Sequence, residues 1–279
     1  FDDGRVFIAQ PPLYKIKKGK IEKYISNDDE LNKFLSNGFF DGKHIVFNDN
    51  KLTPKECSGI LMNYSKINSL IKPTSNSTDN PLLACMSFIE PLSDNTNPGS
   101  QELDNYLSKL SELLKDISPI NISYTLSHVE LEHESFQINV IKKVNGIIDS
   151  SIVPINKKFF SSQTYTNLIS LHLHEYYDAQ IILKQESGDV VYKYIHKFCE
   201  DAFASARKSI SLQRYKGLGE MNPSQLAETT MNPETRSLLK VSQIPDDDYS
   251  IFDTLMGEDV EKRKDFIIST ANTIDHVDI

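Results

Sequence analysis

The sequence predicts an α+β fold, because segments with strand periodicity and segments with helix periodicity alternate along the chain. Residues 13–17 and 21–25 alternate apolar and polar side chains, which is the pattern of a half-buried strand. Residues 100–117 place apolar side chains at the i, i+3, i+4, i+7 spacing of an amphipathic helix. Asn145-Gly146, a strong signal for a two-residue hairpin turn, separates two further strand-like segments.

The first 35 residues predict a strand, a hairpin and a short helix. Residues 5–9 have strand composition, and the two strands of the hairpin meet at Lys18-Gly19-Lys20, where glycine suits the turn. Residues 28–35 then predict a short helix. The chain begins without an initiator methionine or a signal peptide, so we expect it to start inside a longer polypeptide.

The middle of the chain predicts an α+β unit of its own. Thr53-Pro54-Lys55-Glu56 is a capping box with proline at the first helical position, and it opens a helix that Pro73 ends before a loop at 74–80. The helix at 100–117 follows, and then strands at 121–130, 135–144 and 147–155.

Two further helices complete this unit, at about 162–176 and 190–207. The unit is of ordinary domain size.

The last third begins with a strand at 210–215, which runs into a turn with two glycines. Asn222 as N-cap and Pro223 at the first turn predict a helix through about Thr230, and Asn232-Pro233 repeats that pattern. Two final helices are predicted at about 249–256 and 258–272.

Composition and charge exclude some classes of protein and favour a reducing compartment. The net charge of -9 argues against a chain that coats nucleic acid along its whole length. Residues 1–25 carry six basic against three acidic side chains, and residues 207–222 carry four against one, so two basic segments bracket an acidic middle. No apolar run approaches the roughly 20 residues that span a membrane. The three cysteines form no CxxC pair, which favours a reducing cytoplasm.

The segment from Arg214 to Asn222 has the features of a phosphate contact. Arg214 and Lys216 would share one face of a strand, because side chains alternate with period two. Gly217 and Gly219 would let the backbone approach a neighbour closely, and Asn222 would begin a helix whose free N–H groups favour anions. An ordinary strand-to-helix turn has the same features, so these residues alone do not decide between the two interpretations.

The longer string decides in favour of a function. Residues 212–223, continuing through Met231, resemble the characteristic motif of bacterial type IIA topoisomerase B subunits. Residues 6–15 and the lysines of 17–20 match the same family near the start, and Leu255-Met256-Gly257 resembles the end of a gyrase B subunit. The stretch from about Ser36 to Gly188 resembles the large insertion of Gram-negative gyrase B subunits. Ala227 departs from the pattern, which often has an aromatic residue there.

The resemblance implies an organisation in three parts. Residues 1–35 would be the first part of a toprim and tail region, 36–188 an inserted α+β domain, and 189–279 the second part of the tail region with C-terminal helices. The whole enzyme would be an ATP-hydrolysing DNA topoisomerase that negatively supercoils DNA by double-strand cleavage, passage and religation. Its partners would be double-stranded DNA and the gyrase A subunit in an A2B2 heterotetramer, with no membrane.

The resemblance also implies which residues act and which groups this chain lacks. The whole enzyme would use ATP and Mg²⁺, but the strings that bind them do not occur here, so we expect no cofactor and no catalysis from this chain alone. Arg214, Lys216, Gly217, Gly219 and Asn222 would lie near DNA or the active site. A second set of candidates for DNA contact comprises Lys15, Lys17, Lys18 and Lys20.

Spacing argues against metal ligands elsewhere in the chain. Asp246 and Asp248 have Asp-x-Asp spacing without its context, and we interpret them as an acidic helix start. His172 and His174 would lie on one helix, where i, i+2 spacing points them apart. His128 and His133 fall in strand-like sequence, and we expect no metal there either.

Two alternatives to the gyrase assignment stay open. The chain could belong to the topoisomerase IV B subunit, although the insertion favours gyrase. It could also be a non-enzymatic protein or DNA interaction module that keeps the gyrase-like ends only as scaffold.

Overall fold

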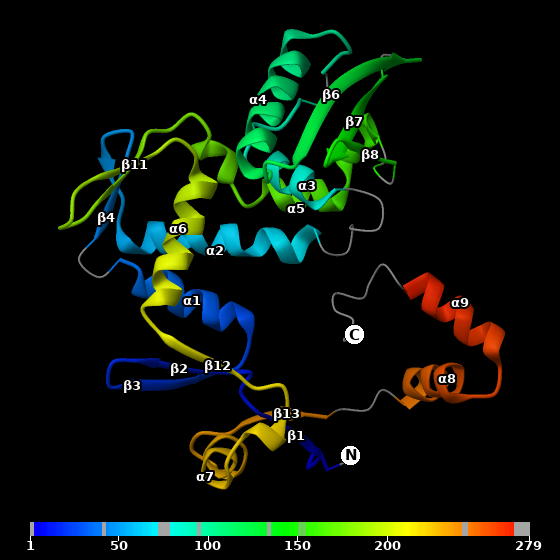
Figure 1. The fold of residues 1–279 in the computed structure, drawn as a ribbon. Helices are drawn as coiled ribbons and strands as arrows, with labels where there is room; N and C mark the ends of the chain where they lie inside the picture. The colour runs from blue at the N-terminus through cyan, green and yellow to red at the C-terminus, as the bar shows by residue number, and fades with distance from the viewer. Residues whose placement is uncertain are drawn as a thin grey trace. The chain divides into compact units, whose positions relative to one another are not determined.

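A computed structural model describes residues 3–40, 43–71, 79–93, 96–132, 135–150, 152, 154–241 and 245–270, with the backbone alone for 245–249. The chain forms two compact units. Unit 1 comprises residues 1–38 and 203–279, and unit 2 comprises residues 39–202 (Figure 1). The domain limits predicted from the sequence, at 35/36 and 188/189, stay a prediction. The second boundary between the units, at 202/203, lies inside helix α6 (Ile195–Lys208), farther along the chain than the predicted boundary.

Unit 1 contains a three-stranded antiparallel sheet in the order β12-β2-β3. Its strands are β2 (Tyr14–Lys18), β3 (Ile21–Ile25) and β12 (Ser211–Arg214). Helix α1 (Asp28–Gly38) covers one face, and the Tyr14 hydroxyl donates to Asp28 Oδ1 at 2.5 Å. The core of this part consists of the buried side chains of Tyr14, Ile16, Ile25, Leu31 and Leu35. The predicted hairpin and short helix are confirmed.

A separate two-stranded sheet in unit 1 joins distant parts of the sequence. Strand β1 (Phe7–Gln10) pairs antiparallel with β13 (Ser237–Lys240), so Phe7 lies opposite Lys240. The sequence predicted a strand at 5–9 but not β13. The last elements are α8 (Pro245–Met256) and α9 (Val260–Thr270), which confirm the two predicted C-terminal helices.

Unit 2 contains two sheets. The first has the order β11-β10-β4-β5, and the second is a long hairpin, β6 with β7, whose second strand also pairs with β8 and β9. The bounds of the first sheet are β4 (His44–Phe47), β5 (Asn50–Lys51), β10 (Ile181–Lys184) and β11 (Val190–Tyr192). The bounds of the second are β6 (Ile122–Leu131), β7 (Ser135–Val144), β8 (Ile147–Asp149) and β9 (Ile155–Asn156).

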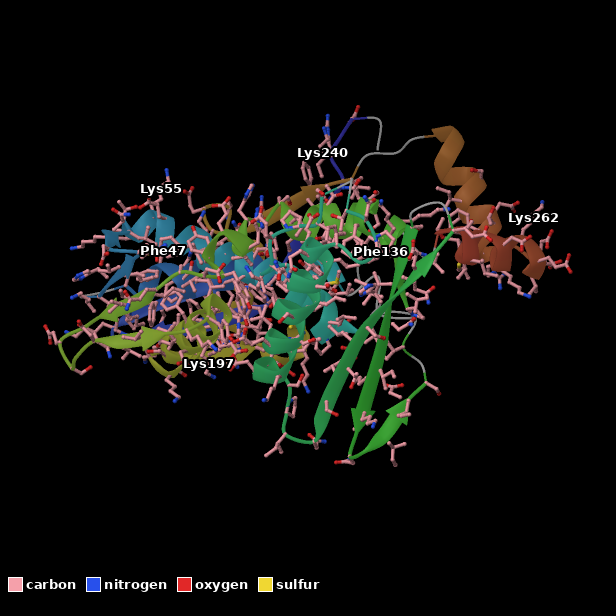
Figure 2. All side chains as sticks on the ribbon, turned by 90° about the horizontal axis from the view of Figure 1, so that it is seen from above. Phe47, Lys55, Phe136, Lys197, Lys240 and Lys262 are labelled. Atoms are coloured by element: carbon pink, nitrogen blue, oxygen red, sulfur yellow. The ribbon has the colours of Figure 1, made fainter. Side chains whose placement is uncertain are left out.

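Several α-helices and the first part of α6 pack with these sheets. They are α2 (Pro54–Ile71), α3 (Asn80–Met86), α4 (Gln101–Ile117) and α5 (Gln163–Ile169). Helix α4 runs alongside the β6–β7 hairpin in both views (Figures 1 and 2) and buries six side chains of its predicted apolar face, among them Leu103, Leu110 and Leu114. The capping box of α2 is confirmed, since the Glu56 N–H donates to Thr53 Oγ1 at 3.3 Å.

Several expectations about unit 2 were wrong. The strand expected at 147–155 is two short strands, and the helix expected to begin at 190 starts with strand β11, because Val190-Val191-Tyr192 favours extended backbone. The hairpin β4–β5 and helix α3 were not predicted. Most of the loop expected at 74–80, with Pro73, lies outside the described residues, and α3 already begins at Asn80.

The helix expected at about 162–176 ends at Ile169. His172 has a left-handed backbone with φ of 54°, and a short 3₁₀ helix, η3 (Leu173–Tyr176), follows it. The expectation that His172 and His174 lie on one helix was therefore wrong.

None of the helices within the described ranges is long and apolar enough to cross a membrane. Cys57, Cys85 and Cys199 are free and buried.

Candidate nucleic-acid interface

The segment 211–222 begins as an edge strand and leaves the sheet at a fixed point. Strand β12 ends at Arg214, and the Tyr215 N–H still donates to the Leu13 carbonyl at 2.9 Å. The Tyr215 side chain is buried, whereas Lys216 directly after it is exposed. Tyr215 therefore anchors the point from which the exposed segment departs.

Two of the basic residues predicted as DNA contacts, Arg214 and Lys15, lie on opposite faces of the sheet. Arg214 lies opposite Tyr14, and its guanidinium carbon is 6.0 Å from the centre of the Tyr14 ring. Lys15 lies opposite Gln213, so it belongs to the other face of the sheet. Because the strand ends at Arg214, the period-two argument that placed Lys216 beside Arg214 does not extend to Lys216.

Lys15 and Lys17 share one carboxylate. Lys15 Nζ lies 2.9 Å and Lys17 Nζ lies 3.3 Å from the two oxygens of Glu22. The hydrogen bond from Lys15, followed by the one from Lys17, holds the pKa of Glu22 below its usual value. The two lysines thus present less free charge than the sequence suggested. Lys20 is exposed at the turn, where Gly19 has a φ of 60°, and Lys18 is half-buried.

The backbone conformation of the chain does not require glycine at position 217 or at position 219. Gly217 has an extended backbone with φ of -172°, and Gly219 is not among the residues with positive φ. A Cβ atom at either position would meet no described atom within 4 Å. The local turn is held instead by Glu220, whose Oε2 accepts the Lys216 N–H at 3.0 Å.

Asn222 is an N-cap, as predicted, and forms a capping box. Its Oδ1 accepts the Gln225 N–H at 2.9 Å, and the Gln225 side chain accepts the Asn222 N–H at 3.2 Å. The α-helix that follows, α7 (Pro223–Leu226), has four residues and continues as one π turn, Ala227–Met231. Asn232-Pro233 starts no helix, and a turn leads from it into β13. The helix predicted from Asn222 through about Thr230 is thus present, and its contact with a phosphate stays a prediction.

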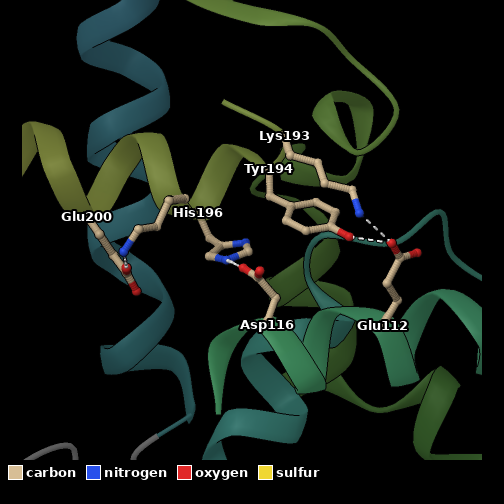
Figure 3. Close-up of polar contacts among 7 residues, drawn as sticks. Glu112, Asp116, Lys193, Tyr194, His196 and Glu200 are labelled. Carbon is tan, nitrogen blue, oxygen red and sulfur yellow. Dashed lines mark hydrogen bonds and ion pairs between the residues drawn. The ribbon is translucent and has the colours of Figure 1, made fainter. Parts of the chain in front are cut away.

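A polar cluster in unit 2, which no sequence pattern indicated, links α4 to the start of α6 (Figure 3). His196, which is 2% exposed, has its Nε2 2.9 Å from Asp116 Oδ2. Glu112 accepts hydrogen bonds from Lys193 at 2.7 Å and from the Tyr194 hydroxyl at 2.6 Å. The paired residues lie about 80 positions apart, so no local pattern could have revealed them.

The contacts of these polar residues favour a structural role, in which they hold α4 to the start of α6. Burial lowers the pKa of His196, and the hydrogen bond with Asp116 opposes that effect only in part. Each acidic side chain already has its own partner inside the cluster. A cavity next to the cluster is lined in part by Asp116, His196 and Glu200.

Metal-binding groups are scarce in the part of the chain that the structure describes. One group of three potential ligands occurs there, formed by His172, His174 and Glu175. This set does not fit Mg²⁺, which prefers oxygen ligands, so no magnesium chemistry is assigned to these residues. His128 lies 3.8 Å from Asp104, and His133 and the side chains of Asp246 and Asp248 lie outside the described residues.

Comparison with known families identifies the chain in three segments. The model of the DNA gyrase B subunit insert domain matches residues 48–174, and the model of the DNA gyrase B subunit carboxyl terminus matches residues 207–268. A third model, described as "GyrB, hook", matches residues 12–35. The order of the matches agrees with that of the two units, because the insert match lies within unit 2 and the other two lie within unit 1.

Similar whole sequences give the same result. The type 2 topoisomerase B subunit of Aquifex aeolicus is 32% identical across 100% of this chain, and the DNA gyrase B subunit of Rickettsia bellii is 29% identical across 99%. The corresponding gyrase protein of Campylobacter jejuni is 28% identical across 99%. The chain spans about a third of the length of these relatives, 34%, 34% and 33% respectively.

The class of protein is therefore a type II DNA topoisomerase B subunit. Since all three matched models describe gyrase B subunits, one of them the insert domain, the chain belongs to the DNA gyrase B subunit family.

Proposed function

We propose that this chain is the part of a gyrase B subunit that contacts DNA and the gyrase A subunit through residues 214–222. The whole enzyme negatively supercoils DNA by ATP-dependent double-strand cleavage, passage and religation in the cytoplasm, as an A2B2 heterotetramer. The insert domain tunes these contacts. ATP and Mg²⁺ bind to parts of the enzyme other than this chain, and the chain alone is inactive.

One observation carries the proposal. Gly217 and Gly219 have no conformational requirement for glycine, and a Cβ atom added at either would meet no described atom within 4 Å. Close approach by another molecule is the remaining physical reason for glycine at both positions. The exposed Lys216 beside them makes a phosphate backbone the favoured molecule.

The anchoring of this segment supports the same conclusion. Tyr215 and the capping box of Asn222 fix its two ends, and the side chain of Glu220 closes the turn between them. A contact held in this way loses little conformational entropy when it binds. The segment therefore suits a positioning role, in which Lys216 touches a DNA phosphate or a carboxylate of the active site.

The test uses the full-length B subunit reconstituted with the A subunit. We expect Lys216→Ala to reduce DNA cleavage and supercoiling by at least about tenfold, since a charge-assisted hydrogen bond contributes about 1.5–3 kcal/mol. Gly219→Ala should reduce both activities as well, because the added Cβ meets no atom of the chain but would obstruct a partner. ATP hydrolysis without DNA should stay unchanged in both variants.

Lys66→Ala is the matched control, because Lys66 is an exposed lysine on a helix of unit 2. Its supercoiling rate should equal that of the unaltered enzyme. Supercoiling at the unaltered rate by Lys216→Ala would remove Lys216 from the proposed contact.

A further inference from the structure

Three potential metal ligands come together where the sequence seemed to separate them. One ligand atom each from His172, His174 and Glu175 lies within 4.8 Å of the other two. The imidazole centres of the two histidines are 5.9 Å apart, and His172 Nδ1 lies 2.9 Å from Glu175 Oε1. The proposed DNA contact uses none of these residues.

The left-handed residue His172 produces this arrangement. In a continuous helix the side chains of His172 and His174 would diverge by about 200°, because each residue turns the helix by about 100°. At φ of 54° and ψ of 27° the chain instead breaks between α5 and η3. Left-handed backbone at a residue other than glycine is uncommon and is often found at functional sites.

The turn that carries the ligands is fixed from beneath. Leu171 and Leu173, which alternate with the two histidines, are 6% and 1% exposed. The Asn63 side chain on α2 donates to the Leu171 carbonyl at 3.1 Å, and the Tyr176 ring packs edge-on against Phe47. These contacts fix the backbone of residues 171–176 on unit 2.

Two of the three ligand side chains are accessible. His172 and Glu175 have side chains that are 66% and 58% exposed. An ion could therefore reach them from solvent.

The donor set selects the kind of ion. Two imidazoles and one carboxylate match Zn²⁺, which takes nitrogen and oxygen ligands at about 2.0–2.2 Å in tetrahedral sites. Ligand atoms around such an ion lie about 3.3 Å apart. These side chains must therefore rotate to bring the three ligand atoms, which now lie within 4.8 Å of one another, to that distance. His174 Nδ1 is buried and has no hydrogen-bond partner in the described chain, so binding through this ring disrupts no hydrogen bond at that atom.

We propose that His172, His174 and Glu175 form a binding site for Zn²⁺ or a similar transition-metal ion on the insert domain, with water in the remaining coordination position. The site links the end of the turn after α5 to the first residues of η3. Its role is to stiffen this turn on the surface of unit 2.

The test is a titration of the metal-free 279-residue chain with ZnCl₂, measured by isothermal titration calorimetry. We expect one ion per chain with micromolar affinity, and a cobalt-loaded sample should show the intense visible absorption of four-coordinate Co²⁺. His172→Gln and His174→Gln should each weaken binding by more than about tenfold, since even loss of a ligand's hydrogen-bonding partner costs about 10- to 100-fold.

His128→Gln is the control, because His128 belongs to the same unit and lies near a carboxylate, 3.8 Å from Asp104, but outside the cluster. It should bind Zn²⁺ like the unaltered chain. Unchanged circular dichroism without metal would show that the two ligand variants are folded. Absence of binding at submillimolar Zn²⁺, or equal affinity of His174→Gln and the unaltered chain, would overturn the proposal.

Discussion

The buried carboxylate of Asp79 offers the sharpest test of how the insert domain is held together. Asp79 is 3% exposed in its side chain and forms an ion pair with Lys142 on β7, which is 16% exposed. It also accepts the Tyr124 hydroxyl from β6 at 2.7 Å and the Leu82 N–H at the start of α3 at 3.2 Å. One side chain thus ties a helix start to the long hairpin.

The cost of removing this carboxylate follows from its three contacts. Asp79→Ala removes a helix cap worth about 1 kcal/mol and leaves the Tyr124 hydroxyl without its acceptor. Among the ion pairs of the described residues it also leaves Lys142 with Asp149 alone, 3.9 Å away, and breaking a buried ion pair from one side costs about 3–5 kcal/mol. Since these losses overlap, we expect the free energy of unfolding to fall by about 4 kcal/mol. Asp79→Asn keeps an acceptor for both hydrogen bonds and should cost about half as much.

Urea denaturation followed by circular dichroism measures this loss, and a double-mutant cycle assigns it. Lys142→Met alone should cost about 2 kcal/mol, because Asp79 keeps two hydrogen-bond donors. The double variant Asp79→Asn, Lys142→Met should be at least about 1 kcal/mol more stable than the sum of the single effects predicts. A loss below about 1 kcal/mol for Asp79→Ala, or strictly additive effects, would refute the ion pair as the source of stability.

Two further predictions concern buried titratable groups. Burial lowers the pKa of His196 below its ordinary 6.5, so the folded state binds fewer protons than the unfolded state below that pH. Stability should therefore fall as the pH drops below about 6.5, and His196→Gln should flatten that fall in denaturation curves recorded from about pH 7.5 to 5. Burial also raises the pKa of Cys57 to about 11 and raises those of Cys85 and Cys199, so all three thiols should react with Ellman's reagent at about pH 8 only as fast as the chain opens. Rapid reaction of even one thiol would contradict this.

The sequence predicted those elements whose signals are local. The capping box at Thr53, the apolar face of 101–117 and the turn at Asn145-Gly146 each concern a few neighbouring residues, and the structure has the corresponding α2, α4 and β7–β8 connection. The strand periods did not reveal partners, because alternation identifies a strand but not the strand beside it. Pairing of Phe7 with Lys240 is such a case.

The histidine cluster shows a different reason for failure. The apolar spacing of 165, 168, 169, 173 and 176 continues a helical period across His172, and those side chains do face the core in part. The same burial is achieved by a helix, a left-handed residue and a 3₁₀ turn in succession. Periodicity alone could not detect the break, since tertiary packing decided the backbone at one residue.

The candidate interface and Lys216 within it were predicted from the motif, and the structure adds a physical reason for preferring Lys216 to two of the hairpin lysines. From the motif Lys216 was the first candidate for contact with DNA, and the lysines of the hairpin were a second set. The structure separates them, because Lys15 and Lys17 share the carboxylate of Glu22. These two lysines must break their ion pairs with Glu22 before they bind a phosphate, and that exchange reduces the net free energy of binding. Lys216 follows the buried Tyr215 and precedes Gly217, where an added Cβ atom would meet no described atom within 4 Å. We therefore expect removal of Lys216 to reduce DNA cleavage more, and stability less, than removal of Lys15 or Lys17.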